Sequence, residues 1–227
     1  EGGKVLLISA MNLLDNREKE KNQTICFPVE FEEESCRMEI PDQYQFLDYG
    51  MDLYAPQTNL DQEGRRVMMA WVRMPQVTEE GWIGMFCSPR VVEVREGHIC
   101  FRMHPHIRQA YSREIPDPSR ASEGGYMASF ALEEGEEADL GGFRVRREKG
   151  RIRTDRTGVY PSFEGAHLIS ETPEITGKTH LEVLVDRHLI EVYVNDGEYV
   201  ISNAVYGLGS GISYRGPEQI RLYTTEN

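Results

Sequence analysis

The sequence predicts an all-β protein, and three observations support this fold class. Short apolar or alternating runs rich in Val, Ile, Tyr and Phe recur along the 227 residues. Gly, Pro or Asp bounds most of these runs, as is typical of strands joined by tight turns. No stretch of a dozen residues carries an apolar stripe with the 3.6-residue period of a helix.

The expected strands begin close to the first residue and recur to the end of the chain. Each is a short run of apolar, β-branched or aromatic residues, which favour the surface of a sheet. They lie at 5–8, 25–29, 67–72, 91–94, 99–101, 181–185, 189–194, 199–205 and 220–223. The clearest hairpin turns at Asn195-Asp196-Gly197, because these residues supply the positive φ angles that a tight turn requires.

The charge balance excludes several classes of partner. Asp and Glu number 38 against 25 Lys and Arg, for a formal net charge of −13. Nucleic acids and anionic membrane surfaces both require a basic footprint, so neither is expected as a partner. No apolar run approaches the roughly 18 residues of a membrane span. A hydrophobic content of 39% is too high for a disordered chain.

The cysteines and the first residues favour a cytoplasmic setting. The four thiols form no Cys-x-x-Cys pair, and their strand-like neighbours predict small buried side chains at Cys26, Cys36, Cys87 and Cys100. The chain starts Glu1-Gly-Gly-Lys without a signal-peptide pattern. A chain that begins inside a strand is either the later part of a longer one or has lost a tag or an initiator Met.

A polar stretch divides the chain into two expected units. His104-Pro105-His106 and the Pro-containing run 115–119 frame a segment with few strand formers. We therefore predict a first unit at 1–105, a linker at 106–118 and a β-sandwich of short antiparallel strands at 119–227. The first unit has room for two strand-turn-strand units of roughly 40 residues, the size of propeller blades.

One segment of the first unit has the composition of a sugar site. Asp48, Asp52 and Tyr54 lie in the run Phe-Leu-Asp-Tyr-Gly-Met-Asp-Leu-Tyr-Ala-Pro-Gln-Thr at 46–58, and Trp71 lies in a nearby expected strand. Carboxylates hold sugar hydroxyls, and aromatic faces pack against the apolar side of the ring. The alternative is structural, because an Asp beside Gly is usually a turn former and a Trp in a strand usually belongs to the core.

This segment opens a series of motifs with a fixed order. It is followed by Gly-Arg-Arg at 64–66, Ala-Trp at 70–71, Gly-Trp-Ile-Gly at 81–84 and Pro-Arg at 89–90. A separate motif at 185–197 contains Ile-Glu-Val-Tyr and then Asn-Asp-Gly. The first series resembles glycoside hydrolase family 32, the β-fructosidases, and the second is similar to the family's C-terminal sandwich signature. The resemblance is weakest over 110–180.

The resemblance implies the last blades of a five-bladed β-propeller followed by a C-terminal β-sandwich. It implies retaining hydrolysis of β-fructosides such as sucrose, sucrose 6-phosphate or fructans, in which one carboxylate is the nucleophile and another the acid/base. It implies no metal and no organic cofactor. Asp48, Asp52, Tyr54 and Trp71 match positions at or near the substrate pocket, and Met51 replaces the Lys of plant-type members.

The motifs that carry the family's chemistry do not occur in this sequence. In the family the nucleophile lies in Asn-Asp-Pro-Asn-Gly, the transition-state stabiliser in Arg-Asp-Pro and the acid/base in Glu-Cys. Residues 3–9 resemble the strand that follows the Glu-Cys motif. We therefore expect this chain to be the C-terminal part of an enzyme, with no catalytic residue of its own and no activity alone.

Three further patterns predict structure rather than chemistry. His104 and His106 form a His-x-His pair, but the pattern offers no third ligand, so no metal site is expected. The loop Gly-Leu-Gly-Ser-Gly at 207–211 lacks the Lys and the helix of a phosphate loop, so we expect a strand-linking turn. Glu191 is expected to be structural, paired across strands or with Arg187.

Two functions from different classes remain open. The first is the C-terminal part of a β-fructosidase that acts on a fructose-containing saccharide. The second is a stand-alone, non-catalytic sugar-binding or assembly module derived from the family. An upstream reading frame with the missing motifs favours the first, and a start codon just before Glu1 favours the second. A partial propeller leaves sheet edges uncovered, so we expect a homodimer or pairing with a chain that supplies the missing blades.

Overall fold

Antiparallel sheets form almost the whole molecule. The structure is a computed structural model that describes residues 3–14, 20–117, 121, 125–216 and 219–225. Its strands belong to four sheets, so the predicted all-β class is confirmed. Within these ranges no helix is long and apolar enough to cross a membrane.

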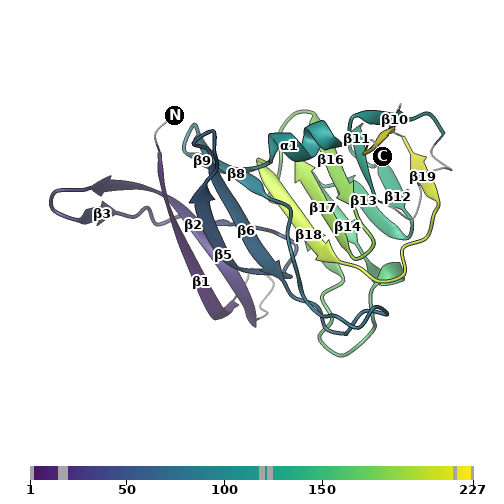
Figure 1. The fold of residues 1–227 in the computed structure, drawn as a ribbon, viewed down its shortest axis with the longest axis horizontal. Helices are drawn as coiled ribbons and strands as arrows, with labels where there is room; N and C mark the ends of the chain where they lie inside the picture. Colours follow the sequence, from purple (N-terminus) through teal and green to yellow (C-terminus); the bar gives the residue numbers. More distant parts are fainter. Residues whose placement is uncertain (1–2, 15–19, 118–120, 122–124, 217–218, 226–227) are drawn as a thin grey trace.

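Two of the sheets lie in the first half of the chain. The first contains β1 (Lys4–Leu14), β2 (Glu20–Glu32) and β3 (Arg37–Glu39), and β4 (Gln45–Phe46) also pairs with β2. The second has the order β5 (Leu53–Leu60), β6 (Arg66–Val72), β8 (Arg90–Arg95) and β9 (His98–Met103), and β7 (Met85–Phe86) pairs with β6. Figure 1 shows β1 and β2 at one end of the molecule, with β5, β6, β8 and β9 beside them.

The other two sheets form a sandwich. The six-stranded sheet has the order β10 (Arg113–Ile115), β20 (Arg221–Thr224), β11 (Tyr126–Leu132), β16 (Thr179–Val185), β17 (Leu189–Val194) and β18 (Tyr199–Ala204). The five-stranded sheet has the order β15 (Ile169–Glu171), β14 (Arg151–Asp155), β13 (Phe143–Glu148), β12 (Glu137–Leu140) and β19 (Ile212–Arg215). Strand β18 is therefore an edge, and it is the edge that faces the first half of the chain (Figure 1).

Two hydrophobic clusters hold these layers together. One lies within the sandwich and combines inward-facing residues of both sheets, such as Phe143 and Val192. The other contains Leu47 and Met68 from the first half of the chain and Leu184 and Tyr193 from the outer face of the six-stranded sheet. The second cluster therefore joins the two halves of the chain into one body.

The segment expected as a linker has secondary structure of its own. It contains the short helix α1 (Pro105–Ala110) and then β10, which pairs with β20 at the edge of the six-stranded sheet. The side chain of His104 caps the helix by accepting a hydrogen bond from the backbone N–H of His106. The Pro residues at 115–119 indicated a connection, but three residues of pairing suffice for an edge strand.

The predicted hairpin is present, and its turn contacts strand β9 of the sheet formed by β5, β6, β8 and β9. Strands β17 and β18 pair from Leu189↔Ala204 to Val194↔Tyr199, and Asn195, Asp196 and Gly197 all have positive φ. The N–H of Phe101 donates to the carbonyl of Gly197 over 2.8 Å. A Cβ at position 197 would lie 2.5 Å from the Phe101 carbonyl oxygen, so this contact requires glycine.

Three of the four cysteines are buried as expected, and Cys36 is not. Cys26, Cys87 and Cys100 lie in strands or against them, while Cys36 lies exposed in the turn between β2 and β3 with φ of 55°. The prediction of a buried Cys36 was wrong because Glu-Glu-Glu-Ser-Cys forms a turn rather than a strand. Burial raises the pKa of both Cys26 and Cys87 to about 12.

Candidate functional site

The segment from Asp48 to Asp52 joins β4 to β5 and runs along the edge of strand β18. The N–H of Tyr49 donates to the carbonyl of Val200 over 2.9 Å, and the side-chain amide of Asn203 donates to the carbonyl of Gly50 over 3.0 Å. A Cβ at Gly50 would lie 1.8 Å from the Ser202 carbonyl oxygen. The absence of a side chain at position 50 is therefore what allows the two backbones to meet.

Asp48 lies in a buried ion-pair network that joins the two halves of the chain. Its Oδ2 accepts from Arg90 Nη1 at 2.8 Å, and its Oδ1 accepts from the N–H groups of Gly50 and Ser202 at 2.8 and 2.9 Å. Arg90 also pairs with Glu191 of β17 at 2.7 Å and donates to the Ser202 hydroxyl. Complete burial raises the pKa of Asp48 above its ordinary value, although Arg90 and the hydrogen bonds act in the opposite direction.

Asp52 lies in a second buried pair on the same strand edge. Arg156, which follows β14 in the sandwich, donates to both carboxylate oxygens of Asp52, one of them over 3.1 Å. The N–H of Ala204 donates to Asp52 Oδ2 over 2.9 Å. Arg156 also donates to the carbonyls of His167 and Ala204, and its guanidinium lies 3.6 Å from the ring centre of Tyr160. Each side-chain nitrogen of Arg156 and each carboxylate oxygen of Asp52 therefore has a hydrogen-bond partner inside the protein.

The aromatic candidates are less buried than the aspartates, since Tyr54 is half-buried and Trp71 is exposed. Tyr54 and Trp71 are register partners across β5 and β6, so they lie side by side on one face of that sheet. Phe86 of β7 is the register partner of Trp71 on the other side. Trp71 is 47% exposed and Phe86 is 69% exposed, which is unusual for side chains of this size. We call Tyr54, Trp71 and Phe86 the aromatic row.

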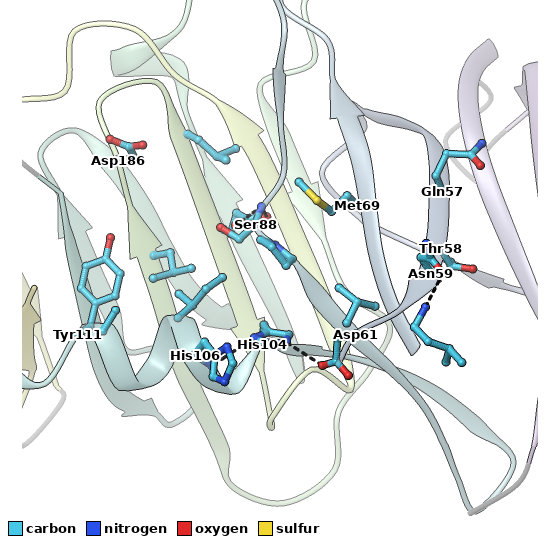
Figure 2. Close-up of a pocket in the computed structure, with 18 of the residues that line it drawn as sticks. Gln57, Thr58, Asn59, Asp61, Met69, Ser88, His104, His106, Tyr111 and Asp186 are labelled. Atoms are coloured by element: carbon cyan, nitrogen blue, oxygen red, sulfur yellow. Dashed lines mark hydrogen bonds and ion pairs between the residues drawn. The ribbon is translucent and has the colours of Figure 1, made fainter. Parts of the chain in front are cut away.

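A cavity of about 980 Å³ continues this face toward the sandwich. Figure 2 shows Gln57 and Met69 of the β5–β6 face on one side and Tyr111 and Asp186 on the other. Gln57 and Met69 are register partners one step along the sheet from the aromatic row. Helix α1 contributes His106 and Ile107 to the cavity wall, and Glu191 also lines it. Most of the lining surface is apolar, and a smaller part of it is polar.

Both histidines of the His-x-His pair line this cavity, and each has an acidic neighbour. His104 Nε2 lies 3.2 Å from Asp61 Oδ2, as Figure 2 shows, and His106 Nε2 lies 3.9 Å from Glu63. Asp61 also pairs with Arg65 at 2.6 Å. The residues that the structure describes contain no group of three His, Cys, Asp or Glu side chains arranged to hold a metal ion.

The structure therefore divides the predicted site residues into two sets. Tyr54 and Trp71 lie together on an exposed face, whereas Asp48 and Asp52 are 3% and 7% exposed and bind arginines. Neither aspartate lines the cavity beside the aromatic row. Their part in a substrate pocket stays a prediction.

Sequence reasoning quoted Arg90 only as part of the Pro-Arg motif at 89–90 and missed Arg156. Arg156 lies in a region without a recognised motif, and only its position after an alternating Arg-Ile-Arg-Thr run could have indicated a strand end. Of the two alternatives expected for Glu191, pairing with Arg187 was wrong, because Arg187 pairs with Glu80. Glu191 instead contacts its cross-strand neighbour Ser202 over 3.4 Å and forms an ion pair with Arg90 of β8. The expected turn at 207–211 does join β18 to β19, and Gly209 donates to the carbonyl of Gly141 over 2.9 Å.

The order of the motifs and this fold have matches among known proteins. Residues 2–105 match the model of the N-terminal domain of glycosyl hydrolases family 32, and residues 122–227 match the model of the family's C-terminal domain. The chain belongs to glycoside hydrolase family 32. Similar sequences within the family include a sucrose-6-phosphate hydrolase of Vibrio alginolyticus, 25% identical over 201 residues, and a raffinose invertase of Escherichia coli, 30% identical over 185 residues.

Solved family 32 structures have the same fold. A sucrose-6-phosphate hydrolase from Lactobacillus gasseri superposes with a TM-score of 0.80 at 16% identity, and a Bombyx mori β-fructofuranosidase with 0.76 at 22%. Both matches cover 99% of this chain and 52% of the other chain. The two sequence relatives are covered over 39% and 38% of their lengths. The predicted partial propeller followed by a sandwich is confirmed, and the chain spans about half of such a protein.

Proposed function

We propose that this chain is the C-terminal part of a retaining glycoside hydrolase that acts on β-fructosides. The observation that carries the proposal is the match of both family 32 models, in order, along one chain. The relatives are named for hydrolysis of sucrose 6-phosphate and for invertase action on raffinose. Sucrose, sucrose 6-phosphate and fructans are therefore the proposed substrates, and the cytoplasm is the proposed setting. No metal or organic cofactor enters this proposal.

The proposal includes inactivity of the chain alone. A retaining glycosidase requires two carboxylates about 5 Å apart, one as nucleophile and one as acid/base. The sequence lacks the motifs in which family 32 carries them. The two buried aspartates do not replace them, because each binds an arginine and at least one backbone N–H, that of Ser202 for Asp48 and that of Ala204 for Asp52. Without both groups, pocket walls alone supply binding but no chemistry.

The proposed contribution of this chain is therefore to the pocket wall. Tyr54 and Trp71 would present ring faces to the apolar side of a fructosyl ring. Asp48 and Asp52 would support that wall from behind, since their oxygens are already bound to protein donors. Support for this division comes from the exposure of Trp71 and the burial of both carboxylates.

The exposed aromatic row also supports a partner for this face. Three large rings on one sheet face, continuous with an apolar cavity, form a patch that a soluble protein normally covers. We propose a chain that supplies the missing blades as the occupant, with a homodimer through 1–105 as the alternative. Light scattering of this chain should show association that Phe86→Ser weakens. A clean monomer at high concentration contradicts the homodimer, and a monomer that also fails to associate with an added upstream segment carrying the missing blades contradicts the other form.

An activity assay tests the function directly. Release of fructose from sucrose, sucrose 6-phosphate and inulin is measured for this chain and for the gene product extended upstream. We expect no release from the chain and release of fructose by the extended product. Activity of the short chain would overturn the proposed absence of catalytic carboxylates. An extended product that binds fructose without releasing it would support the non-catalytic binding module instead.

A further inference from the structure

We propose that the sandwich positions the wall of the substrate pocket, through its edge strand β18 and the side chains of Arg156 and Glu191. This inference rests on the proposed function, because it assigns a role to residues that support the pocket. It starts from the fact that β18 is the edge of the six-stranded sheet. An edge strand has free N–H and C=O groups on its outer side, and a protein must cover or occupy them.

The segment 48–52 occupies this edge in place of a strand. The N–H groups of Ser202 and Ala204, two residues apart, point to the same side of β18. They donate to the carboxylates of Asp48 and Asp52, four residues apart, over 2.9 Å each. The N–H of Tyr49 also donates to the carbonyl of Val200, which lies on β18 between Ser202 and the hairpin turn. The Asp-x-x-x-Asp spacing thus fits alternate N–H groups of an edge strand.

Each carboxylate is fixed by an arginine that the sandwich also holds. Arg156 is a sandwich residue, and its hydrogen bonds to the carbonyls of His167 and Ala204 hold its guanidinium where it reaches Asp52. Arg90 comes from β8, but Glu191 of β17 binds its second nitrogen at 2.7 Å. Buried charges held by several hydrogen bonds have little freedom to move, so the sandwich fixes the position of both aspartates.

We call the contacts that hold the segment 48–52 on β18 the anchor. The position of the aromatic row depends on this anchor. Tyr54 lies two residues after Asp52, at the start of β5, and pairs with Trp71 across the sheet. A shift of the anchored segment along β18 would move Tyr54 with it, because only Leu53 lies between. Arg156 and Glu191 are therefore positioning residues that act on the proposed pocket wall from the opposite domain, without a contact to substrate.

Hydrogen exchange of this chain tests the anchor without any activity. In Asp52→Asn we expect amides in 47–54 and 199–206 to exchange at least tenfold faster, while amides of β11 and β16 keep their rates. Asp196→Asn is the matched control, because Asp196 also joins the two halves, through Arg95, Arg102 and Arg108 at the far end of the β17–β18 hairpin. Equal acceleration in both variants, or none in 47–54, overturns the anchor.

A milder variant keeps the test decisive if Asp52→Asn does not fold. Ser202→Ala removes the hydroxyl that contacts Asp48 and Arg90 and leaves the backbone N–H in place. We expect faster exchange in 47–54, about threefold or more, with unchanged exchange in the sandwich core. Unchanged exchange in 47–54 counts against the proposal in this variant as well.

Kinetics of the upstream-extended gene product test the positioning role. For Glu191→Gln and Arg156→Lys we expect KM for sucrose to rise about tenfold with a smaller change in kcat, because the wall that binds the ring moves while the reacting carboxylates do not. Asp196→Asn should leave both constants within twofold. A loss confined to kcat, or an equal loss in Asp196→Asn, overturns positioning. If the extended product is inactive, the proposed function fails, and the exchange experiment still decides whether the anchor exists.

Discussion

Arg90 has no exposed surface, yet it is a charged side chain between two carboxylates from different halves of the chain. Its guanidinium lies 2.8 Å from Asp48 and 2.7 Å from Glu191, so the cluster holds two negative charges and one positive charge. Hydrogen bonds from Ser202 and from the N–H of Ser88 reach the carboxylates as well. The positive charge of Arg90 therefore offsets the free-energy cost of burying the two carboxylates.

Replacement of Arg90 by Met should consequently be among the most destabilising single changes. Two carboxylates would remain buried without their counter-charge, and we expect the free energy of unfolding to fall by about 3–5 kcal/mol. Urea unfolding followed by circular dichroism measures this change. Arg37→Met is the control, because Arg37 forms only an exposed pair with Glu39 and should cost less than about 1 kcal/mol. Equal losses in the two variants would contradict the assigned role of Arg90.

Thiol chemistry should distinguish the cysteines one by one. A thiolate is the reactive form, and a pKa of about 12 leaves Cys26 and Cys87 protonated at neutral pH. Burial also raises the pKa of Cys100, whereas Cys36 is exposed. Titration with a disulfide reagent at pH 8 should therefore show one fast thiol in the native chain and four after unfolding. The fast reaction should disappear in Cys36→Ala, and a fast phase that persists would contradict the described burial.

Strand β18 and the segment 48–52 show what the sequence could and could not predict at the scale of elements. The β17–β18 hairpin was predicted because Asn-Asp-Gly fixes its turn locally. The contact between Asp48 and Ser202 joins residues 154 positions apart, and no local pattern encodes it. Strands β13 and β14 were also missed, since their Arg-rich alternation resembles a charged loop until their partners are known. The aspartates were recognised as unusual, but not as acceptors for a strand edge.

Gly50→Ala tests how closely this segment and strand must approach. The added Cβ would overlap the Ser202 carbonyl at 1.8 Å, so one of the two backbones must move. We expect a loss of about 2–4 kcal/mol in the free energy of unfolding, which is typical of overpacking and strain at a buried site. Gly211→Ala is the control, because a Cβ there meets nothing within 4 Å. Thermal melting of both variants gives the comparison, and a tolerated Gly50→Ala would refute the close contact.

At the scale of the whole molecule, ion pairs join the propeller part to the sandwich at several points. They include Asp52–Arg156 and Arg90–Glu191 beside the segment 48–52, the group of Arg95, Arg102 and Arg108 around Asp196, and Glu80–Arg187. The shared apolar cluster that contains Met68 and Tyr193 lies between the two halves as well. The halves are thus fixed by charge and by burial together, and the molecule should unfold as one unit.

The contact at Asp196 predicts a dependence on pH. Burial alone raises the pKa of Asp196, but hydrogen bonds and charges from Arg108, Arg102 and Arg95 outweigh it and hold the pKa below its ordinary value of 3.8. A lowered pKa contributes stability above the ordinary value, and this contribution is lost as the pH falls through the lowered one. Melting temperatures of the wild type and Asp196→Asn should differ at pH 6 and converge below about pH 3.8. A constant difference would contradict the assignment.

Because the segment 48–52 covers the edge of β18, it also affects how copies of this chain can associate through their sheets. A strand from another molecule that extended the sheet there would have to displace Asp48 and Asp52 and so remove a buried carboxylate partner from Arg90 and from Arg156. An ionised carboxylate accepts hydrogen bonds but donates none. Asp48 and Asp52 therefore cannot supply the N–H groups that a further strand would need to pair with this edge. We therefore expect no fibril growth and no strand exchange through this edge of the sandwich, even at high protein concentration.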